Sequence, residues 1–320
     1  MPRFLLGVLR QRHKANREVI ACLLLRAKAL LLSATIAAML PSSSFAQAKT
    51  FTSGANDSLA ISSGRPLSEV SRLLESRFGT PVTYEDPVLW IWSGDISPGE
   101  NGWRGMIPKI RTLTLSAKLN PLLNKNLDFL LLGKIVDAYN GQTDGTRFRV
   151  SSSRWGLHIA PIQAHNSSGQ LVTIKPIMDY RITIPVASRV PYMHFRTICE
   201  ALTKSSGISI KEAAPWMDQY FAPNGLIPPR AREMTPKEEN QASITWGCKG
   251  MTAREAINSM IENSATTLTW HLLCSADPKE QDCRLNLHPI QIMVGDPNAT
   301  MIRSIPWDRS KDRPTYIPEN

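Results

Sequence analysis

Histidines are the side chains of this sequence best suited to chemistry near neutral pH, because their pKa lies closest to it. Five follow the N-terminal segment, at positions spread along the chain: His158, His165, His194, His271 and His288. No two have the His-x-x-x-His or His-Glu-x-x-His spacing of a metal site on one helix. Those in predicted strands are expected to be hydrogen-bonded or solvent-facing, and a metal or proton-transfer role would require residues assembled in three dimensions. We therefore expect no metal ligand among them.

Acidic side chains offer no stronger catalytic pattern. Glu85, Asp86 and Asp144 lie in predicted turns, where carboxylates commonly accept hydrogen bonds from nearby backbone amides. Nothing in the sequence holds two acids at the separation that a glycosidase needs. The Gly-x-Ser-x-Gly elbow of serine hydrolases and the glycine loop of phosphate-binding proteins are also missing. We expect no catalytic residue and no cofactor.

Four cysteines remain after the N-terminal segment, an even number that is typical of an exported protein with disulfides. Cys274 ends one predicted strand and Cys283 begins the next, so the two can face each other across a hairpin. We expect this disulfide. Pairing of Cys199 with Cys248 would need a helix and a strand to align, and it stays open. The absence of a Cys-x-x-Cys pair argues against a zinc site.

Tryptophans gather in the loop after the first predicted helix and strand, at Trp90, Trp92 and Trp103. Large aromatic rings among glycines and prolines can offer contact area to a partner protein or to sugar rings. They can also fold back over the core, since tryptophan is usually largely buried. A second loop, residues 215–236, holds Trp216 and allows the same two interpretations. These four tryptophans are the candidate partner-binding residues.

Residues 1–48 have the three parts of a signal peptide: a basic head, the apolar run 29–40 and the small residues of Ala46-Gln47-Ala48. The run is shorter than the about 20 apolar residues that span a membrane, which argues against an uncleaved anchor. The whole chain has 37 basic and 27 acidic residues, a net charge of +10. Seven of the basic and one of the acidic residues lie in the leader, so 30 and 26 remain, a net charge of +4. That balance does not favour nucleic-acid binding. We expect a periplasmic or secreted protein with no membrane span after cleavage.

Hydrophobic periodicity predicts the same order of elements twice. In residues 243–290 a strand precedes a helix with a capping box of Thr252 and Glu255, and two alternating strands follow. The apolar stripe of an earlier helix recurs 128 positions later in the chain, where Leu67, Val70, Leu74 and Gly79 correspond to Phe195, Ile198, Leu202 and Gly207. We predict an α+β fold of two tandem β-α-β-β-α-β-β domains, with helices packed on small mixed sheets. The domains are 59–177 and 178–292, followed by a flexible tail at 293–320.

The order of these elements resembles the short N-terminal domain shared by secretins and TonB-dependent receptors. The resemblance is carried by residues 65–70, 78–84, 251–257 and 268–270, which are hydrophobic patterns rather than fixed chemical residues. The chain also resembles secreted bacterial proteins that carry such repeats alone. In that family the domain is a non-catalytic periplasmic docking module, and the resemblance implies the same role here.

The function expected from the sequence is a non-catalytic binding or scaffold module of the bacterial envelope. Its partner would be an envelope protein, docked through exposed sheet edges and the two aromatic loops. The alternative is a secreted hydrolase of polysaccharide or cell wall with a site assembled from loops. Two acids, or histidines with an acid, gathered in one concave pocket would favour that alternative.

Overall fold

The computed structural model describes residues 50–53, 57–88, 92–99, 105–121, 127–213, 221, 243–277, 280–294 and 301–304. By its internal contacts the chain divides into Met1–Gln47 and Ala48–Asn320, and every described residue belongs to the second unit. The predicted signal peptide lies outside the described residues, as do Trp90, Trp103 and Trp216. None of the described helices has the length and apolar character needed to cross a bilayer.

The helices begin and end at the local signals that the sequence carries. In the described part of the chain they are α2 (Pro66–Phe78), α3 (Phe129–Gln142), α4 (Pro191–Ser206) and α6 (Ala253–Ile261), with 3₁₀ turns η2 (Ser93–Asp95), η3 (Ala117–Leu119) and η4 (Ile177–Asp179). Both α2 and α4 have proline in the first turn and end at a left-handed glycine, Gly79 and Gly207. The predicted capping box of Thr252 with Glu255 opens α6.

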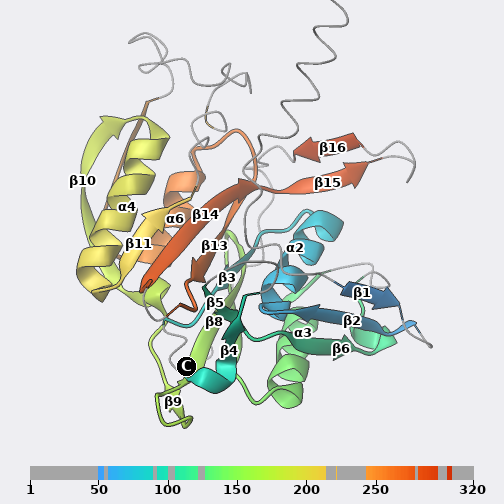
Figure 1. Cartoon of the computed structure of the whole chain (residues 1–320). Coiled ribbons are helices and arrows are strands. Elements are labelled where there is room, and N and C mark those ends of the chain that lie inside the picture. Colours follow the sequence, from blue (N-terminus) through green and yellow to red (C-terminus); the bar gives the residue numbers. More distant parts are fainter. Residues whose placement is uncertain are drawn as a thin grey trace, which may run out of the picture. The chain divides into compact units, whose positions relative to one another are not determined.

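The strands form one large sheet and several small ones (Figure 1). Those of the first half are β1 (Thr50–Ser53), β2 (Leu59–Ser63), β3 (Val82–Glu85), β4 (Ile96–Pro98), β5 (Met106–Pro108), β6 (Arg111–Leu115), β7 (Arg147–Ser153), β8 (Gly156–His165) and β9 (Leu171–Thr173). Those of the second half are β10 (Arg181–Arg189), β11 (Ser209–Glu212), β12 (Ile244–Thr252), β13 (Leu268–Cys274), β14 (Asp282–Pro289), β15 (Gln291–Val294) and β16 (Met301–Ser304). The main sheet runs β11-β14-β13-β3-β8-β7, with β9 paired to β8.

Two strand pairs lie where the sequence predicts irregular structure. β4 and β5 pair within the predicted tryptophan loop. β15 pairs with β16, which lies inside the segment expected to be a flexible tail. Both pairs are short and antiparallel, so each strand contributes few residues to a periodic signal.

The predicted α+β class is confirmed, and helices cover both faces of the main sheet. On one face α2 and α3 share a buried core with Val82 and Tyr84 of β3. On the other face α4 and α6 share a second core with Trp270 and Leu272 of β13. Successive side chains of a strand point to opposite faces, so each half packs its helices on its own side of the sheet.

The two halves have the same strand pairings. β2 pairs antiparallel with β6 as β10 does with β12, and β3 pairs in parallel with β8 as β11 does with β14. β7 and β8 form an antiparallel pair, and so do β13 and β14. A matching side-chain contact also recurs at the offset of 128. The amide of Val82 donates to Glu75 Oε1 over 3.1 Å, and the amide of Ile210 donates to Thr203 Oγ1 over 2.9 Å. These matches agree with duplication of one unit, which stays a prediction.

The halves meet at a seam, where β13 pairs in parallel with β3. His271 lies opposite Tyr84 and Leu272 opposite Glu85, and the Asp86 amide donates to the Leu272 carbonyl over 2.9 Å. Because of this pairing β3 is an interior strand, whereas its counterpart β11 lies at the end of the main sheet.

Two buried arginines bridge the seam. Arg65 donates to Asp86 Oδ2 and to the Cys274 carbonyl, each over 2.7 Å. Arg254 donates to Glu85 Oε2 over 2.9 Å, and this carboxylate also accepts from the Met178 amide. The prediction that Glu85 lies in a turn is wrong, because it is the last residue of β3 and fully buried. Its backbone partner is 93 residues away along the chain rather than a neighbour.

Some sheet edges are closed by side chains of α3. The carboxamide of Gln142 bonds both the amide and the carbonyl of Thr114 in β6, over 2.8 and 2.7 Å. Asn140 bonds both backbone groups of Phe148 in β7 in the same way, over 3.0 and 2.8 Å. Each side chain occupies backbone groups that an added strand would need. In the second half, edge strand β10 carries Pro185, which cannot donate to a neighbouring strand.

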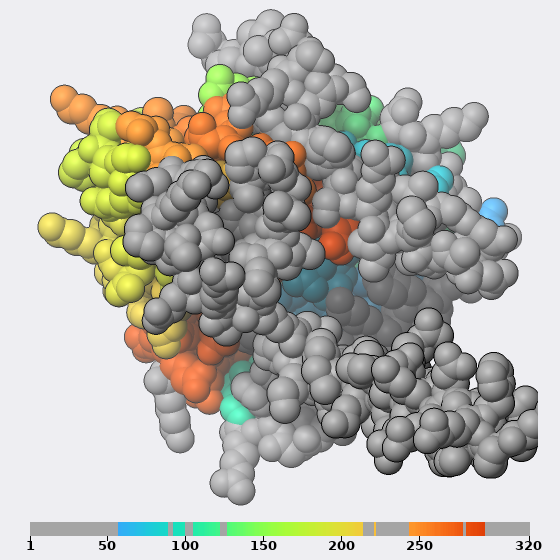
Figure 2. Space-filling view, turned by 90° about the horizontal axis from the view of Figure 1, so that it is seen from above, coloured from blue at the N-terminus to red at the C-terminus, as the bar shows by residue number. Residues whose placement is uncertain are grey.

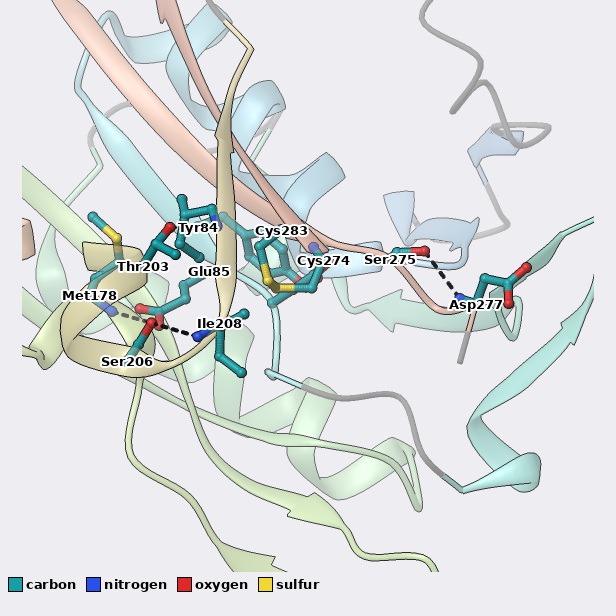
Figure 3. Close-up of a disulfide and its surroundings, with 12 residues drawn as sticks. Tyr84, Glu85, Met178, Thr203, Ser206, Ile208, Cys274, Ser275, Asp277 and Cys283 are labelled. Carbon is teal, nitrogen blue, oxygen red and sulfur yellow. Dashed lines mark hydrogen bonds between the residues drawn. A yellow bond between two sulfur atoms is a disulfide. The ribbon is translucent and has the colours of Figure 1, made fainter. Parts of the chain in front are cut away.

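The predicted disulfide is confirmed between Cys274 of β13 and Cys283 of β14, which lie directly opposite each other (Figure 3). Cys199 and Cys248 are buried and free. The disulfide closes the hairpin whose strands carry His271 and His288.

The disulfide should contribute measurably to stability. Replacing both Cys274 and Cys283 by alanine is expected to lower the free energy of unfolding by roughly 2–3 kcal/mol, because the short loop gains freedom mainly in the unfolded chain. Urea denaturation measures the change. A reducing agent should shift the midpoint of the native chain and leave that of the double variant in place. Equal midpoints for the two chains would contradict the prediction.

Glu85→Gln should remove a pH-dependent loss of stability. Burial raises the pKa of the Glu85 carboxyl from 4.5 to about 7, against the opposite effect of Arg254. A raised pKa means that the contribution of this carboxyl is fully present below pH 4.5 and is lost as the pH rises through about 7. The free energy of unfolding of the native chain, relative to Glu85→Gln, should therefore fall by roughly 3 kcal/mol across that range.

His158→Gln provides a control of opposite sign for this measurement. Burial lowers the pKa of His158 well below 6.5, so its contribution is present above that pH and is lost as the pH falls. Urea denaturation at a series of pH values should thus give slopes of opposite sign for the two comparisons. The same slope for the native chain and Glu85→Gln would show that Glu85 does not titrate in this window.

Candidate functional site

Helix α2 has a buried polar stripe beside its apolar one. Ser68, Ser71 and Glu75 are each at most 4% exposed and lie three and four positions apart, so they share one helical face. The neighbouring stripe of Leu67, Val70 and Leu74 enters the core of the first half. A helix that packs on a sheet usually does so through apolar side chains alone. The polar stripe is therefore the feature of α2 that packing does not explain.

Strands β13 and β14 present polar side chains to this stripe. Thr269 lies opposite His288, and His271 lies opposite Asn286, so all four point to the same face of the sheet. The alternate residues, such as Trp270, point to the other face and enter the second core. The two antiparallel strands thus place two histidines diagonally, and α2 lies over them.

His271 is fully buried and bound by two serines of α2. Its Nδ1 lies 3.3 Å from Ser68 Oγ and its Nε2 lies 3.0 Å from Ser71 Oγ. Ser71 donates its own proton to the Ser68 carbonyl over 2.8 Å, so in this arrangement it accepts from His271 Nε2–H. Burial lowers the pKa of His271 well below 6.5, with smaller effects of His288 and Arg72. The imidazole is therefore neutral, with one lone pair.

Glu75 connects the helix to the second histidine. Its Oε1 accepts from the Val82 amide, and its Oε2 lies 3.2 Å from His288 Nε2. The rings of His271 and His288 meet edge to face, with centroids 5.0 Å apart. The Nδ1 atom of His288 is buried and has no hydrogen-bond partner among the described residues. One nitrogen or oxygen of each of Glu75, His271 and His288 lies within 4.8 Å of the other two.

An open groove of about 300 Å³ borders this cluster, and we call it the α2–β14 groove. Its lining residues come from α2 and from the end of β14 with the residues that follow: Arg72, Glu75, Ser76, Asn286, His288, Pro289, Ile290 and Gln291. Figure 2 shows the blue surface of α2 next to the red surface of the chain near residue 290, in a recessed part of this face. The groove thus has one wall from each half.

A second buried polar cluster lies around Asp95. Its Oδ2 is 2.6 Å from His165 Nδ1, and its Oδ1 accepts from Arg111 over 2.6 Å. Arg111 also pairs with the exposed Asp144. An aspartate that orients a histidine is one part of a hydrolytic triad, but no described hydroxyl or thiol is recorded at hydrogen-bond distance from His165. We therefore assign the cluster a structural role: it holds the η2 segment, through Asp95, against β8 and β6.

Trp92 lies over this second cluster. Its ring centroid is 4.2 Å from that of His165, and the residue is half-buried. A Cβ at Gly94 or Gly169 would lie 2.5 or 2.7 Å from the indole, so these glycines leave room for it. Of the four candidate partner-binding tryptophans, Trp92 is therefore the one whose contacts are described, and its ring packs against His165. Whether it also binds a partner stays a prediction.

The remaining histidines are engaged in structural contacts. His158 bonds the hydroxyls of Thr83 and Ser153 over 2.9 and 2.7 Å. His194 bonds the Ile244 carbonyl over 3.0 Å through Nε2. The sequence-based expectation of hydrogen-bonded histidines in strands is thus confirmed for His158 and His271. Only His271 and His288 come together with an acid in one potential metal-binding group of the described residues.

Comparison with known proteins gives no further guide, since no family model, no curated protein and no solved structure matches this chain. The function must therefore be argued from the site.

The chemistry of the groove follows from its donor set. Two imidazoles and a carboxylate can hold a divalent metal ion, transfer a proton, or bond the polar groups of a ligand. Arg72 adds a permanent positive charge to the wall. Sequence spacing missed this cluster because its members stand at positions 75, 271 and 288. The one local signal was the i, i+3, i+7 stripe of Ser68, Ser71 and Glu75, which by itself has the pattern of a solvent-exposed face.

Trp92→Ala should lower the stability of the protein. The indole covers the buried pair of Asp95 and His165, and its removal exposes that pair to water and leaves a void beside Gly169. We expect a loss of about 1–3 kcal/mol in the free energy of unfolding, less than for a fully buried tryptophan. Chemical denaturation measures this loss. Trp155→Ala removes another half-buried tryptophan elsewhere in the described chain and serves as the control for loss of an indole as such. No loss of stability, combined with weaker partner capture, would instead assign Trp92 to a binding surface.

Proposed function

We propose that this chain is an exported, non-catalytic binding module of the bacterial cell envelope, whose partner docks in the α2–β14 groove. One observation carries the proposal. Polar side chains of both halves line an open groove where a helix meets a sheet, and Glu75 and His288 are paired at its wall. Removing polar groups from water lowers stability unless they are compensated. A ligand that forms hydrogen bonds with these polar groups would compensate for that cost.

The groove is a better docking surface than the sheet edges that the sequence favours. Asn140 and Gln142 occupy backbone groups of β7 and β6, which an added strand would need. The polar walls also give a partner specific groups to recognise, because Arg72, Asn286 and Gln291 can each form hydrogen bonds. The aromatic loops remain candidate contacts, with three of their four tryptophans outside the described residues.

Export and family are part of the proposal. The leader has the composition of a signal peptide, and the Cys274–Cys283 disulfide is compatible with an oxidising compartment. The order of elements is similar to that of the secretin and TonB-dependent receptor short domain, a docking module of the periplasm. We accordingly propose a periplasmic or secreted location and an envelope protein as partner.

A secreted hydrolase of cell wall or other polysaccharide is the second candidate. It is favoured by the meeting of two histidines and an acid beside one groove, because general acid–base chemistry uses such side chains. The two candidates differ in what they predict for a polysaccharide substrate. Release of reducing ends from cell wall, lost in His288→Gln, would select the hydrolase.

Arg72→Ala should weaken partner capture without unfolding the protein. Arg72 is half-buried at the groove wall, and an interface arginine of this kind contributes more than about 1 kcal/mol, so capture should fall about fivefold or more. The measurement is a quantitative pull-down of the same partner band from an envelope extract, with the chain as bait.

Arg196→Ala is the matched control for this pull-down. Arg196 is also a helix arginine, but it lies on the surface of α4 and pairs with Glu200. Its replacement should leave capture unchanged. Equal capture by the native chain and both variants would reject the groove as the docking surface.

A further inference from the structure

Glu75 has a carboxylate oxygen that the fold does not require. In the second half the equivalent position is Thr203, whose single hydroxyl oxygen accepts the amide of Ile210. Glu75 Oε1 performs the same role for Val82. The other oxygen, Oε2, lies 3.2 Å from His288 Nε2 at the groove wall. The hydrogen bond to the Val82 amide, which caps β3, therefore accounts for one carboxylate oxygen of Glu75. The fold of the second half does without the other oxygen, which is available together with His288 to bind a ligand.

We propose that Glu75, His271 and His288 bind a divalent transition-metal ion of the Zn²⁺ type, with an open coordination position toward the α2–β14 groove. The inference deepens the proposed function and rests on it, because it names an ion within the same groove. A metal ion can bind here whether or not a protein partner does, so the two proposals can fail separately.

The geometry of the three side chains fits such an ion. Tetrahedral zinc with ligands at 2.0–2.2 Å places neighbouring ligand atoms about 3.3–3.6 Å apart. The 3.2 Å between Glu75 Oε2 and His288 Nε2 is already close to that separation. The third ligand atom, on His271, lies within 4.8 Å of both and has to approach by at most about 1.5 Å.

The surroundings of these side chains also fit. The Val82 amide holds Glu75 Oε1, which leaves Oε2 as a single ligand atom in a fixed direction. Coordination through His271 Nε2 requires the other tautomer, with the proton on Nδ1, and Ser68 Oγ, 3.3 Å from Nδ1, can accept that proton and orient the ring, as is usual for zinc-binding histidines. Ser71 already donates to the Ser68 carbonyl, so its hydroxyl does not depend on His271 for a partner.

The donor set selects the class of metal. Two imidazoles with one carboxylate suit zinc and neighbouring transition metals, whereas Mg²⁺ and Ca²⁺ require sites built from oxygen atoms. Three protein ligands leave a fourth position for a ligand atom, as in catalytic zinc sites. Arg72 and Asn286 line the same groove and can donate hydrogen bonds to an oxygen anion bound there.

The test is metal binding by the full chain, purified without a histidine tag and freed of metal with a chelator. Isothermal titration and equilibrium dialysis with Zn²⁺ should show saturation at one ion per chain, and Mg²⁺ should not bind. Co²⁺ in place of Zn²⁺ should give the visible absorption of a four-coordinate site. Failure of the native chain to bind Zn²⁺ more tightly than it binds Mg²⁺ would overturn the proposal.

Three variants assign the site. Glu75→Thr copies Thr203 and should keep the strand cap while weakening Zn²⁺ binding by at least about tenfold. His288→Gln should weaken it to a similar extent. His158→Gln, a buried strand histidine held by two hydroxyls outside the groove, should leave it unchanged. Far-UV circular dichroism and thermal melting without metal confirm that each variant is folded. Equal Zn²⁺ affinity in all folded variants would place the ion elsewhere and reject the site.

The partner experiment separates the two proposals. Capture of the envelope protein is repeated with chelator-treated chain and with Zn²⁺ restored. Zn²⁺ binding with no capture in either condition would uphold the metal site and reject the proposed docking function. Capture by a chain that binds no Zn²⁺ would do the reverse.

Discussion

The parallel pairing of β13 with β3 is the contact on which the rest of the structure depends. It joins strands from the two halves into one sheet and turns β3 into an interior strand. It also brings His271 of the second half beneath α2 of the first. Glu85 at the end of β3 and Asp86 after it are buried beside this pairing, and each is paired with an arginine: Glu85 with Arg254 of the second half, and Asp86 with Arg65, which also donates to the Cys274 carbonyl across the seam. A buried charge without its partner would be strongly destabilising, so the arginines and the strand pairing support each other.

The groove is a consequence of that seam. Each half has its own apolar core on its own face of the sheet, and leucine and isoleucine side chains are frequent in both. The polar residues gather where the halves meet, because there α2 extends from its own core onto strands of the other half. Ligand sites commonly lie between packed units for the same reason, since such surfaces are less constrained by core packing.

Local physics made much of the fold predictable. Proline in the first turn and glycine after the last predict the ends of α2 and α4, and the capping box predicts the start of α6. Alternation in β13 and β14 predicts the hairpin, and the hairpin predicts the disulfide. Each of these features depends on residues close together in the chain.

The seam and the candidate site could not be predicted in this way. Pairing of β13 with β3 joins residues about two hundred positions apart, and parallel pairing leaves no turn signature between them. Glu85 was expected in a turn because a short strand followed by acids resembles a strand end at the surface. Glu75 was not singled out because a polar stripe on an amphipathic helix normally faces water. Its burial depends on a neighbour that local periodicity does not reveal.

The difference in length between α3 and α6 accompanies a difference between the strands beside them. α3 has 14 residues and α6 has 9, and the additional turn of α3 carries Asn140 and Gln142 to the sheet edges. The counterpart of β7 in the second half is β13, which is uncapped and joins the neighbouring half. The shorter helix thus leaves β13 open to pair with β3, whereas the longer one occupies backbone groups at the edge of β7. Of these two corresponding strands, one therefore joins the halves and the other ends the main sheet.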